Sequence, residues 1–123
     1  MKDKFVIIIP ARLKSTRFPG KPLIDLCGKS MIQRVWERCC LALPEQLVYV
    51  ATDSTEIAKH CQNLGIQVIM TPESCLTGTD RVYEASKQVD AEIYINVQGD
   101  EPLIDPQDIK NVLECSSASP DNI

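Results

Sequence analysis

Four short, mainly apolar runs constrain the fold of this chain more than any other feature. They occupy residues 5–9, 46–51, 66–70 and 92–97, and the first of them is followed by a proline. Runs of this length and composition are typical of strands that are buried on both faces. We therefore predict a sheet of at least four strands, with other elements covering both of its sides.

Helical patterns occupy the stretches between these runs. The predicted helix starts are Ser30 with Gln33, Asp53 with Glu56, Thr79, and Asp105 with Pro106. The first two are capping boxes, and the last is an N-cap followed by proline at the first helical position. Alternating strands and helices predict an α/β fold, with a mostly parallel, Rossmann-like sheet and helices on both faces.

Composition excludes several classes of protein. The chain has 123 residues, of which 44% are hydrophobic and 24% charged, as in one compact globular domain. Its net charge of −4 disfavours sequence-independent binding of nucleic acid, which needs a basic surface. No apolar run approaches the roughly 20 residues of a membrane span, and none resembles a signal-peptide core. We expect no nucleic-acid or membrane partner and a cytoplasmic location.

The six cysteines do not indicate a disulfide framework or a metal centre. The sequence contains no C-x-x-C motif, and its single histidine offers only one imidazole ligand. Most of the cysteines stand among apolar neighbours, where a free thiol behaves as a small hydrophobic group. We predict reduced, structural thiols.

Ligands of open parallel sheets bind beyond the carboxyl ends of the strands, so the segments after the strands are the candidate site. Residues 10–21 hold four cations, Arg12, Lys14, Arg17 and Lys21, together with two hydroxyl side chains. Such a loop could cradle a polyphosphate, or it could be an ordinary solvated loop. The Walker A and G-x-G-x-x-G motifs are both absent, which disfavours P-loop and nicotinamide enzymes.

The pattern P-A-R-x-x-S-T-R-x-P-G-K-P-L at residues 10–23 resembles the signature of sugar-activating cytidylyltransferases. The greatest resemblance is to the CMP-Kdo synthetase (3-deoxy-manno-octulosonate cytidylyltransferase) family. Residues 50–53, 78–81 and 97–102 match further motifs of that family in the same order. The resemblance implies a nucleotidyltransferase fold. Because family members are roughly twice as long, it also implies that residues 1–123 are the N-terminal, nucleotide-binding part of a single domain whose C-terminal half is absent.

The implied reaction transfers CMP from CTP to 3-deoxy-D-manno-octulosonate (Kdo), giving CMP-Kdo and diphosphate for lipopolysaccharide biosynthesis. Mg²⁺ is the implied cofactor, CTP and Kdo are the implied partners, and the full-length form is expected to be a homodimer. Two alternatives stay open. The acceptor could be another acidic sugar of the sialic acid type, or the chain could be a truncated, non-catalytic CTP-binding module.

The resemblance also implies roles for individual residues. The triphosphate-binding positions match Arg12, Ser15, Arg17 and Lys21, and the base-reading positions match Thr77, Gly78 and Thr79. Arg17 and Lys21 would neutralise charge on the leaving diphosphate, and Asp100 would bind the metal ion. Gln98 and Arg81 would line the sugar side.

Structural alternatives accompany some of these assignments. Asp100 could simply end a strand, and residues 77–80 could be a plain helix cap, a role compatible with base reading. We expect Asp53 to cap a helix and His60 to lie at the surface, neither of them in the chemistry.

Overall fold

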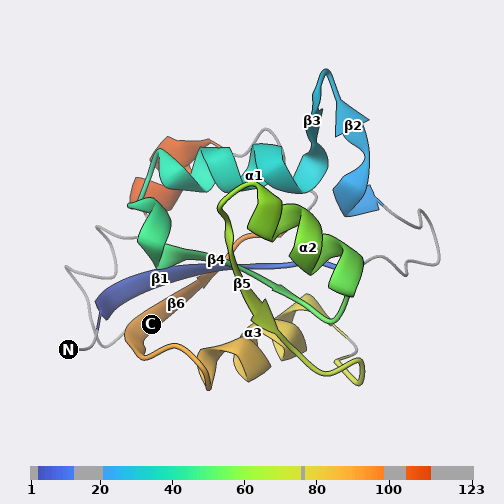
Figure 1. Cartoon of the computed structure of the whole chain (residues 1–123). Coiled ribbons are helices and arrows are strands. Elements are labelled where there is room, and N and C mark those ends of the chain that lie inside the picture. The colour runs from blue at the N-terminus through green and yellow to red at the C-terminus, as the bar shows by residue number, and fades with distance from the viewer. Residues whose placement is uncertain (1–2, 13–20, 76, 99–104, 112–123) are drawn as a thin grey trace.

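The computed structural model describes residues 3–12, 21–75, 77–98 and 105–111. Four parallel strands form the central sheet in the order β5-β4-β1-β6. Their bounds are Asp3–Pro10 for β1, Val48–Thr52 for β4, Gln67–Met70 for β5 and Ala91–Asn96 for β6. The predicted parallel sheet is confirmed, and Figure 1 shows β1 at its centre.

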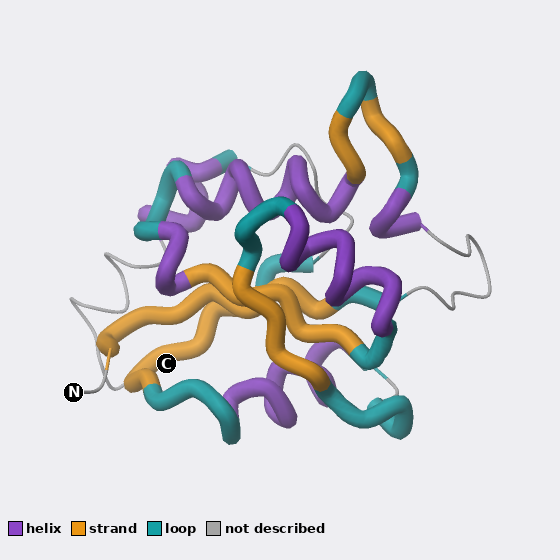
Figure 2. The backbone as a smooth tube through the Cα atoms, in the orientation of Figure 1, coloured by secondary structure: helices purple, strands orange, loops and turns teal. Residues whose placement is uncertain are grey.

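Helices cover both faces of this sheet, as predicted. Helices α1 (Met31–Cys40) and α2 (Thr55–Asn63) lie on one face, together with a short helix at residues 106–111. Helix α3 (Gly78–Ser86) lies on the opposite face, as Figures 1 and 2 both show. Each face of the sheet therefore has its own hydrophobic cluster.

Strand β1 supplies side chains to both clusters. Ile7 and Ile9 pack with α1 and α2, whereas Val6 and Ile8 pack with Ala85 of α3. All four of these β1 side chains are fully buried. The uninterrupted apolar run follows from this position, because successive residues of a strand point to opposite faces and both faces here are covered.

The helix caps agree with the sequence in two places and differ in one. Ser30 caps α1 by accepting a hydrogen bond from the N–H of Gln33, and Asp105 accepts one from Gln107 at the start of the last helix. The predicted cap at Asp53 is wrong, because Ser54 caps α2 by accepting from the N–H of Ile57. The Asp53 carboxylate instead faces Arg81, a partner that is distant in the sequence.

Two further expectations need correction. The second strand begins at Val48 rather than at residue 46, because Glu45–Leu47 forms a 3₁₀ turn (η2) directly after Pro44. His60 is half-buried rather than superficial, since its Nε2 lies 2.7 Å from Ser30 Oγ, at the N-cap of α1.

A two-stranded antiparallel hairpin, β2 (Asp25–Leu26) and β3 (Lys29–Ser30), projects beside α1 and was not predicted. Its two-residue turn is Cys27-Gly28, and both residues have positive φ, 57° and 94°. Left-handed conformations at both positions are the requirement of a type I′ turn.

The five cysteines in the described ranges form no disulfide bond with one another. Burial raises the pKa of Cys61 to about 12. For Cys40, burial and then the nearby carboxylates of Glu45 and Glu37 raise the pKa to about 11. Within the described residues, no helix combines the length and apolar character that crossing a membrane requires.

Candidate active site

The candidate site lies at the edge of the sheet where all four strands end. Backbone hydrogen bonds continue the ladder one residue beyond three of the strands: Ala11 N–H to Ala51 O, Thr71 N–H to Thr52 O, and Val97 N–H to Ile8 O. The segments that follow the strands therefore leave the sheet side by side. This edge is where ligands bind in open parallel α/β sheets.

A buried polar cluster joins two of these strand ends to α3. Arg81, in the first turn of α3, donates from Nη1 to Thr71 Oγ1 at 2.6 Å. The same nitrogen lies 3.7 Å from Asp53 Oδ1, directly beyond β4. The Arg81 side chain is only 3% exposed, so a cation is held almost wholly inside the protein.

Gly78, at the start of α3, lies close to residues at the ends of the two other strands, β1 and β6. A β-carbon at this position would lie 3.1 Å from Gln98 Oε1 and 3.3 Å from Pro10 Cγ. Pro10 ends β1, and Gln98 follows β6. The glycine therefore permits a close approach between the start of α3 and the residues at the ends of β1 and β6.

The N-terminus of α3 is capped by its own sequence. Thr77 Oγ1 accepts a hydrogen bond from the N–H of Asp80 at 3.0 Å, which confirms the predicted cap. Thr77 and Thr79 are both exposed to solvent. Of the predicted nucleotide-binding residues, Thr77, Gly78 and Thr79 thus lie together at a helix N-terminus beside Gln98, and their binding role stays a prediction.

The predicted phosphate-binding residues are only partly within the described ranges. Arg12 is exposed directly after β1, and Lys21 begins the 3₁₀ turn η1 (Lys21–Leu23). Ser15 and Arg17 lie outside the described residues, as does the predicted metal ligand Asp100. The structure thus places the two ends of the basic loop.

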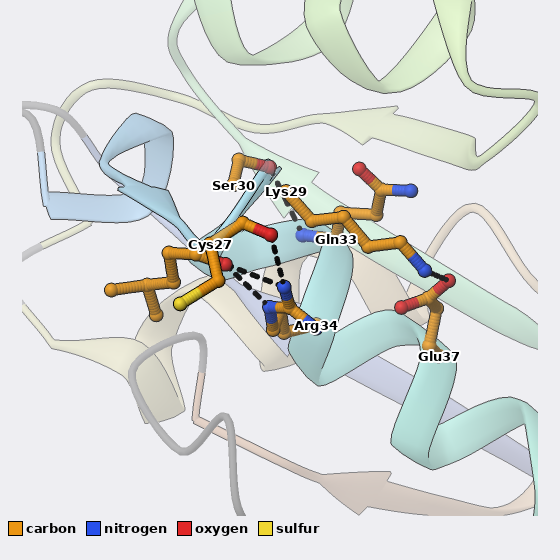
Figure 3. A network of polar contacts seen from close by, with 7 residues as sticks. Cys27, Lys29, Ser30, Gln33, Arg34 and Glu37 are labelled. Atoms are coloured by element: carbon orange, nitrogen blue, oxygen red, sulfur yellow. Dashed lines mark hydrogen bonds and ion pairs between the residues drawn. The ribbon is translucent and has the colours of Figure 1, made fainter.

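The segment that follows the basic loop is fastened to α1, as Figure 3 shows. Arg34 donates from Nε to the carbonyl of Leu26 at 2.9 Å and from Nη2 to that of Cys27 at 3.0 Å. Lys29 forms an ion pair at 2.8 Å with Glu37, three residues beyond Arg34 in the helix. These contacts hold the hairpin on α1 and give the loop 12–21 a fixed point shortly after its end.

No group of three or more potential metal-ligating side chains occurs among the residues that the structure describes. The structure tests neither Asp100 nor Mg²⁺, and both stay predictions.

Sequence reasoning missed the cluster of Asp53, Thr71 and Arg81. It assigned Asp53 to a helix cap and Arg81 to the sugar, whereas the structure brings their side chains together. The positions of Asp53 and Thr71 could have indicated part of this cluster, because each residue directly follows a strand in a parallel sheet. Nothing local in the sequence indicates that Arg81 reaches back to them.

The parallel sheet with a helical layer on each face matches solved nucleotidyltransferase structures, so the chain has a nucleotidyltransferase fold. The structure is similar to that of CMP:2-keto-3-deoxy-manno-octonic acid synthetase complexed with CTP. The TM-score is 0.91 at 46% sequence identity, and the match covers 96% of this chain and 49% of that chain.

The model of the cytidylyltransferase family matches residues 6–122, and the chain belongs to this family. It is 46% identical to the mitochondrial 3-deoxy-manno-octulosonate cytidylyltransferase of Arabidopsis thaliana, over 99% of this chain and 43% of that protein. It is 48% identical to 3-deoxy-manno-octulosonate cytidylyltransferase of Escherichia coli, over 91% of this chain and 46% of that protein. The chain thus spans less than half the length of these curated relatives.

Proposed function

We propose that the complete protein containing these residues transfers CMP from CTP to Kdo. The observation that carries this proposal is the 46–48% identity to relatives named for that reaction, over nearly the whole chain. In the reaction, an acceptor hydroxyl oxygen forms a bond to the α-phosphorus of CTP. The bond between the α-phosphorus and its bridging oxygen breaks, diphosphate leaves, and the hydroxyl proton passes to solvent.

The residues proposed to bind the triphosphate are Arg12, Ser15, Arg17 and Lys21. Their cations would offset the charge of the three phosphates, and Arg17 and Lys21 would stabilise the charge that develops on the leaving diphosphate. The support is that Arg12 and Lys21 border a loop whose start follows β1 and whose continuation is fastened to α1.

Thr77, Gly78 and Thr79 are proposed to bind the cytosine and ribose of CTP. The support is their position at the start of α3, where Thr77 and Thr79 are exposed and where the first backbone N–H groups of a helix lack partners within the helix. Gln98, packed close to Gly78, is proposed to face the acceptor sugar. The start of α3 and the neighbouring Gln98 would thus lie between CTP and the acceptor sugar.

Asp100 is proposed as a ligand of Mg²⁺. When bound, the ion would neutralise charge on the phosphates of CTP. The support is that Asp100 comes four residues after the last residue of β6 in the sequence, and that β6 runs parallel to β1, which precedes the basic loop.

The proposal also covers the acceptor sugar, the use of the product, the oligomeric state and the cellular compartment. The relatives are named for Kdo, so we propose Kdo rather than a sialic acid as the acceptor. We further propose that the product serves lipopolysaccharide assembly, that the complete protein is a homodimer, and that it works in the cytoplasm. The Arabidopsis relative is named as mitochondrial, so the compartment must be tested for this protein separately.

The direct test measures diphosphate release by the complete gene product that contains residues 1–123, with CTP, Mg²⁺ and either Kdo or a sialic acid. We expect release with Kdo alone. Release with the sialic acid alone would overturn the proposed acceptor, and release with neither sugar would overturn the proposed activity.

A matched pair of variants tests the basic loop in the same assay. Arg17→Ala should lower kcat/KM for CTP by about a hundredfold or more, as expected when a group that stabilises developing charge is removed. Lys14→Ala removes an equal charge from a position that matches no family motif and should retain near-parental turnover. Equal effects of both substitutions would contradict a specific role for Arg17.

A further inference from the structure

We propose that Asp53 and Arg81 are positioning residues for nucleotide binding. Together they would fix the first turn of α3 against the ends of β4 and β5 without touching the nucleotide. The inference rests on the proposed function, because residues 77–79 at this turn are the ones proposed to bind the base and ribose of CTP.

The burial of Arg81 argues against direct contact with a substrate. Its side chain is 3% exposed, and Nη1 is used internally by Thr71 Oγ1 at 2.6 Å and by the carbonyl oxygen of Pro72 at 3.5 Å. A guanidinium so enclosed presents almost no surface to a sugar or a base. A positioning role therefore replaces the contact with the sugar that the sequence suggested.

Asp53 supplies the counter-charge for this buried cation. Its Oδ1 lies 3.7 Å from Arg81 Nη1, and its side chain is 23% exposed. Asp53 does not cap α2, because the hydroxyl of Ser54 does so. Removing one partner of a buried ion pair leaves the other uncompensated, which favours rearrangement around it.

Hydrogen bonds in the first turn of α3 link Arg81 to the proposed base-binding residues 77–79. The N–H of Arg81 donates to Thr77 O at 3.2 Å, and the Thr77 side chain caps the same turn. Gly78, between them, lies so close to Gln98 and Pro10 that an added β-carbon would be 3.1 Å from Gln98 Oε1 and 3.3 Å from Pro10 Cγ. A small displacement of Arg81 therefore shifts residues 77–79 relative to both neighbouring strand ends.

The experiment uses two conservative variants, Asp53→Asn and Arg81→Lys, in the complete gene product. Glu56→Gln is the control, since Glu56 is an exposed carboxylate in the first turn of α2 and lies three residues beyond Asp53. Two readouts are compared: amide hydrogen exchange of residues 77–81, and the Kd for CTP together with kcat. Exchange at the start of α2 serves as the internal reference.

We expect both variants to raise amide exchange of residues 77–81 and the Kd for CTP by about tenfold. We expect kcat at saturating CTP to stay within about twofold, because the triphosphate-binding residues are unchanged. Glu56→Gln should alter neither readout. A purely structural role would lower the free energy of unfolding but leave the CTP affinity of the folded protein unchanged.

The outcomes separate this inference from the proposed function. Parental CTP turnover combined with unchanged Kd and exchange in both variants would overturn the positioning role alone. A lower kcat with an unchanged Kd would also overturn it. A parental protein that neither binds nor turns over CTP would overturn the proposed function, and with it any role of these residues in nucleotide binding.

Discussion

Ser30 Oγ and His60 Nε2 are 2.7 Å apart, which links the N-cap of α1 to the last turn of α2. The same hydroxyl accepts a hydrogen bond from the N–H of Gln33 at 3.2 Å. One buried oxygen therefore both starts a helix and fastens it to its neighbour on the same face of the sheet. Because the hairpin β2–β3 runs directly into Ser30, this oxygen also anchors the base of the hairpin.

Ser30→Ala should lower the free energy of unfolding by about 1–2 kcal/mol, from the loss of the cap and of the bond to His60. Ser30→Thr keeps the hydroxyl and should cost much less. Urea unfolding measures both variants. A double-mutant cycle with His60→Ala should give a coupling of at least about 0.5 kcal/mol, whereas strict additivity would contradict the link between the helices.

Cys27→Asn should stabilise the protein by about 0.5–1 kcal/mol, because asparagine tolerates the left-handed conformation that Cys27 adopts at φ 57°. Gly28→Ala should destabilise it by about 1 kcal/mol through backbone strain alone, since a β-carbon there would have no neighbour within 4 Å. Thermal unfolding should show a higher Tm for Cys27→Asn and a lower Tm for Gly28→Ala than for the parent. A loss of stability in Cys27→Asn would contradict the type I′ turn.

Gly78→Ala tests the close approach at the candidate site. The new methyl group would press on Gln98 and on the rigid ring of Pro10, so we expect a loss of about 1–2 kcal/mol in stability and weaker CTP binding. Adding Gln98→Ala should restore part of the stability, since it removes only the flexible neighbour. Calorimetry with CTP and urea unfolding measure the two effects. Parental values for Gly78→Ala in both would show that the packing is looser than described.

Asp100→Asn should reduce Mg²⁺-dependent turnover by at least about a hundredfold, because an amide replaces the charged oxygen proposed to bind the ion. The measurement is a titration of diphosphate release against Mg²⁺ concentration. Asp108→Asn, an exposed carboxylate in the following helix, is the control and should titrate like the parent. If the two variants gave the same Mg²⁺ dependence, the proposed role of Asp100 as a metal ligand would be wrong.

Stability should fall as the pH rises above about 9. The unfolded chain then loses its thiol protons first, whereas burial keeps Cys61 protonated until its pKa of about 12. The folded state binds more protons in this window, so the free energy of unfolding decreases with pH, by about 1.4 kcal/mol per pH unit for this thiol. Urea unfolding of the parent and Cys61→Ala under reducing conditions isolates the effect. Identical slopes would contradict it.

The sequence predicted the layers of the fold well because burial on both faces leaves a local signature. Val6 to Ile9 are apolar in succession, and Ser30, Thr77 and Asp105 cap helices. Local patterns of this kind depend only on neighbouring residues, so a single sequence contains them.

The errors arose where a distant partner decides the role of a residue. The pairing of Asp53 with Arg81 and of Ser30 with His60 depends on the packing of separate helices and strands, which no short window contains. The turn at Cys27-Gly28 was missed because cysteine carries no turn signal, and its conformation is held by Arg34 on α1. The candidate site at the strand ends stays a prediction, whereas the buried pairing of Asp53 with Arg81 beside it was not predicted.

The central place of β1 has a consequence for how the chain is made. Ile7 pairs with Val48 on one side and with Ile95 on the other, so β1 leaves the ribosome before both of its neighbours and gains the second only near residue 95. Until then, an apolar strand with an open edge is present in the nascent chain, a state prone to aggregation. Pauses in translation before residue 91 should therefore increase the dependence of this chain on chaperones.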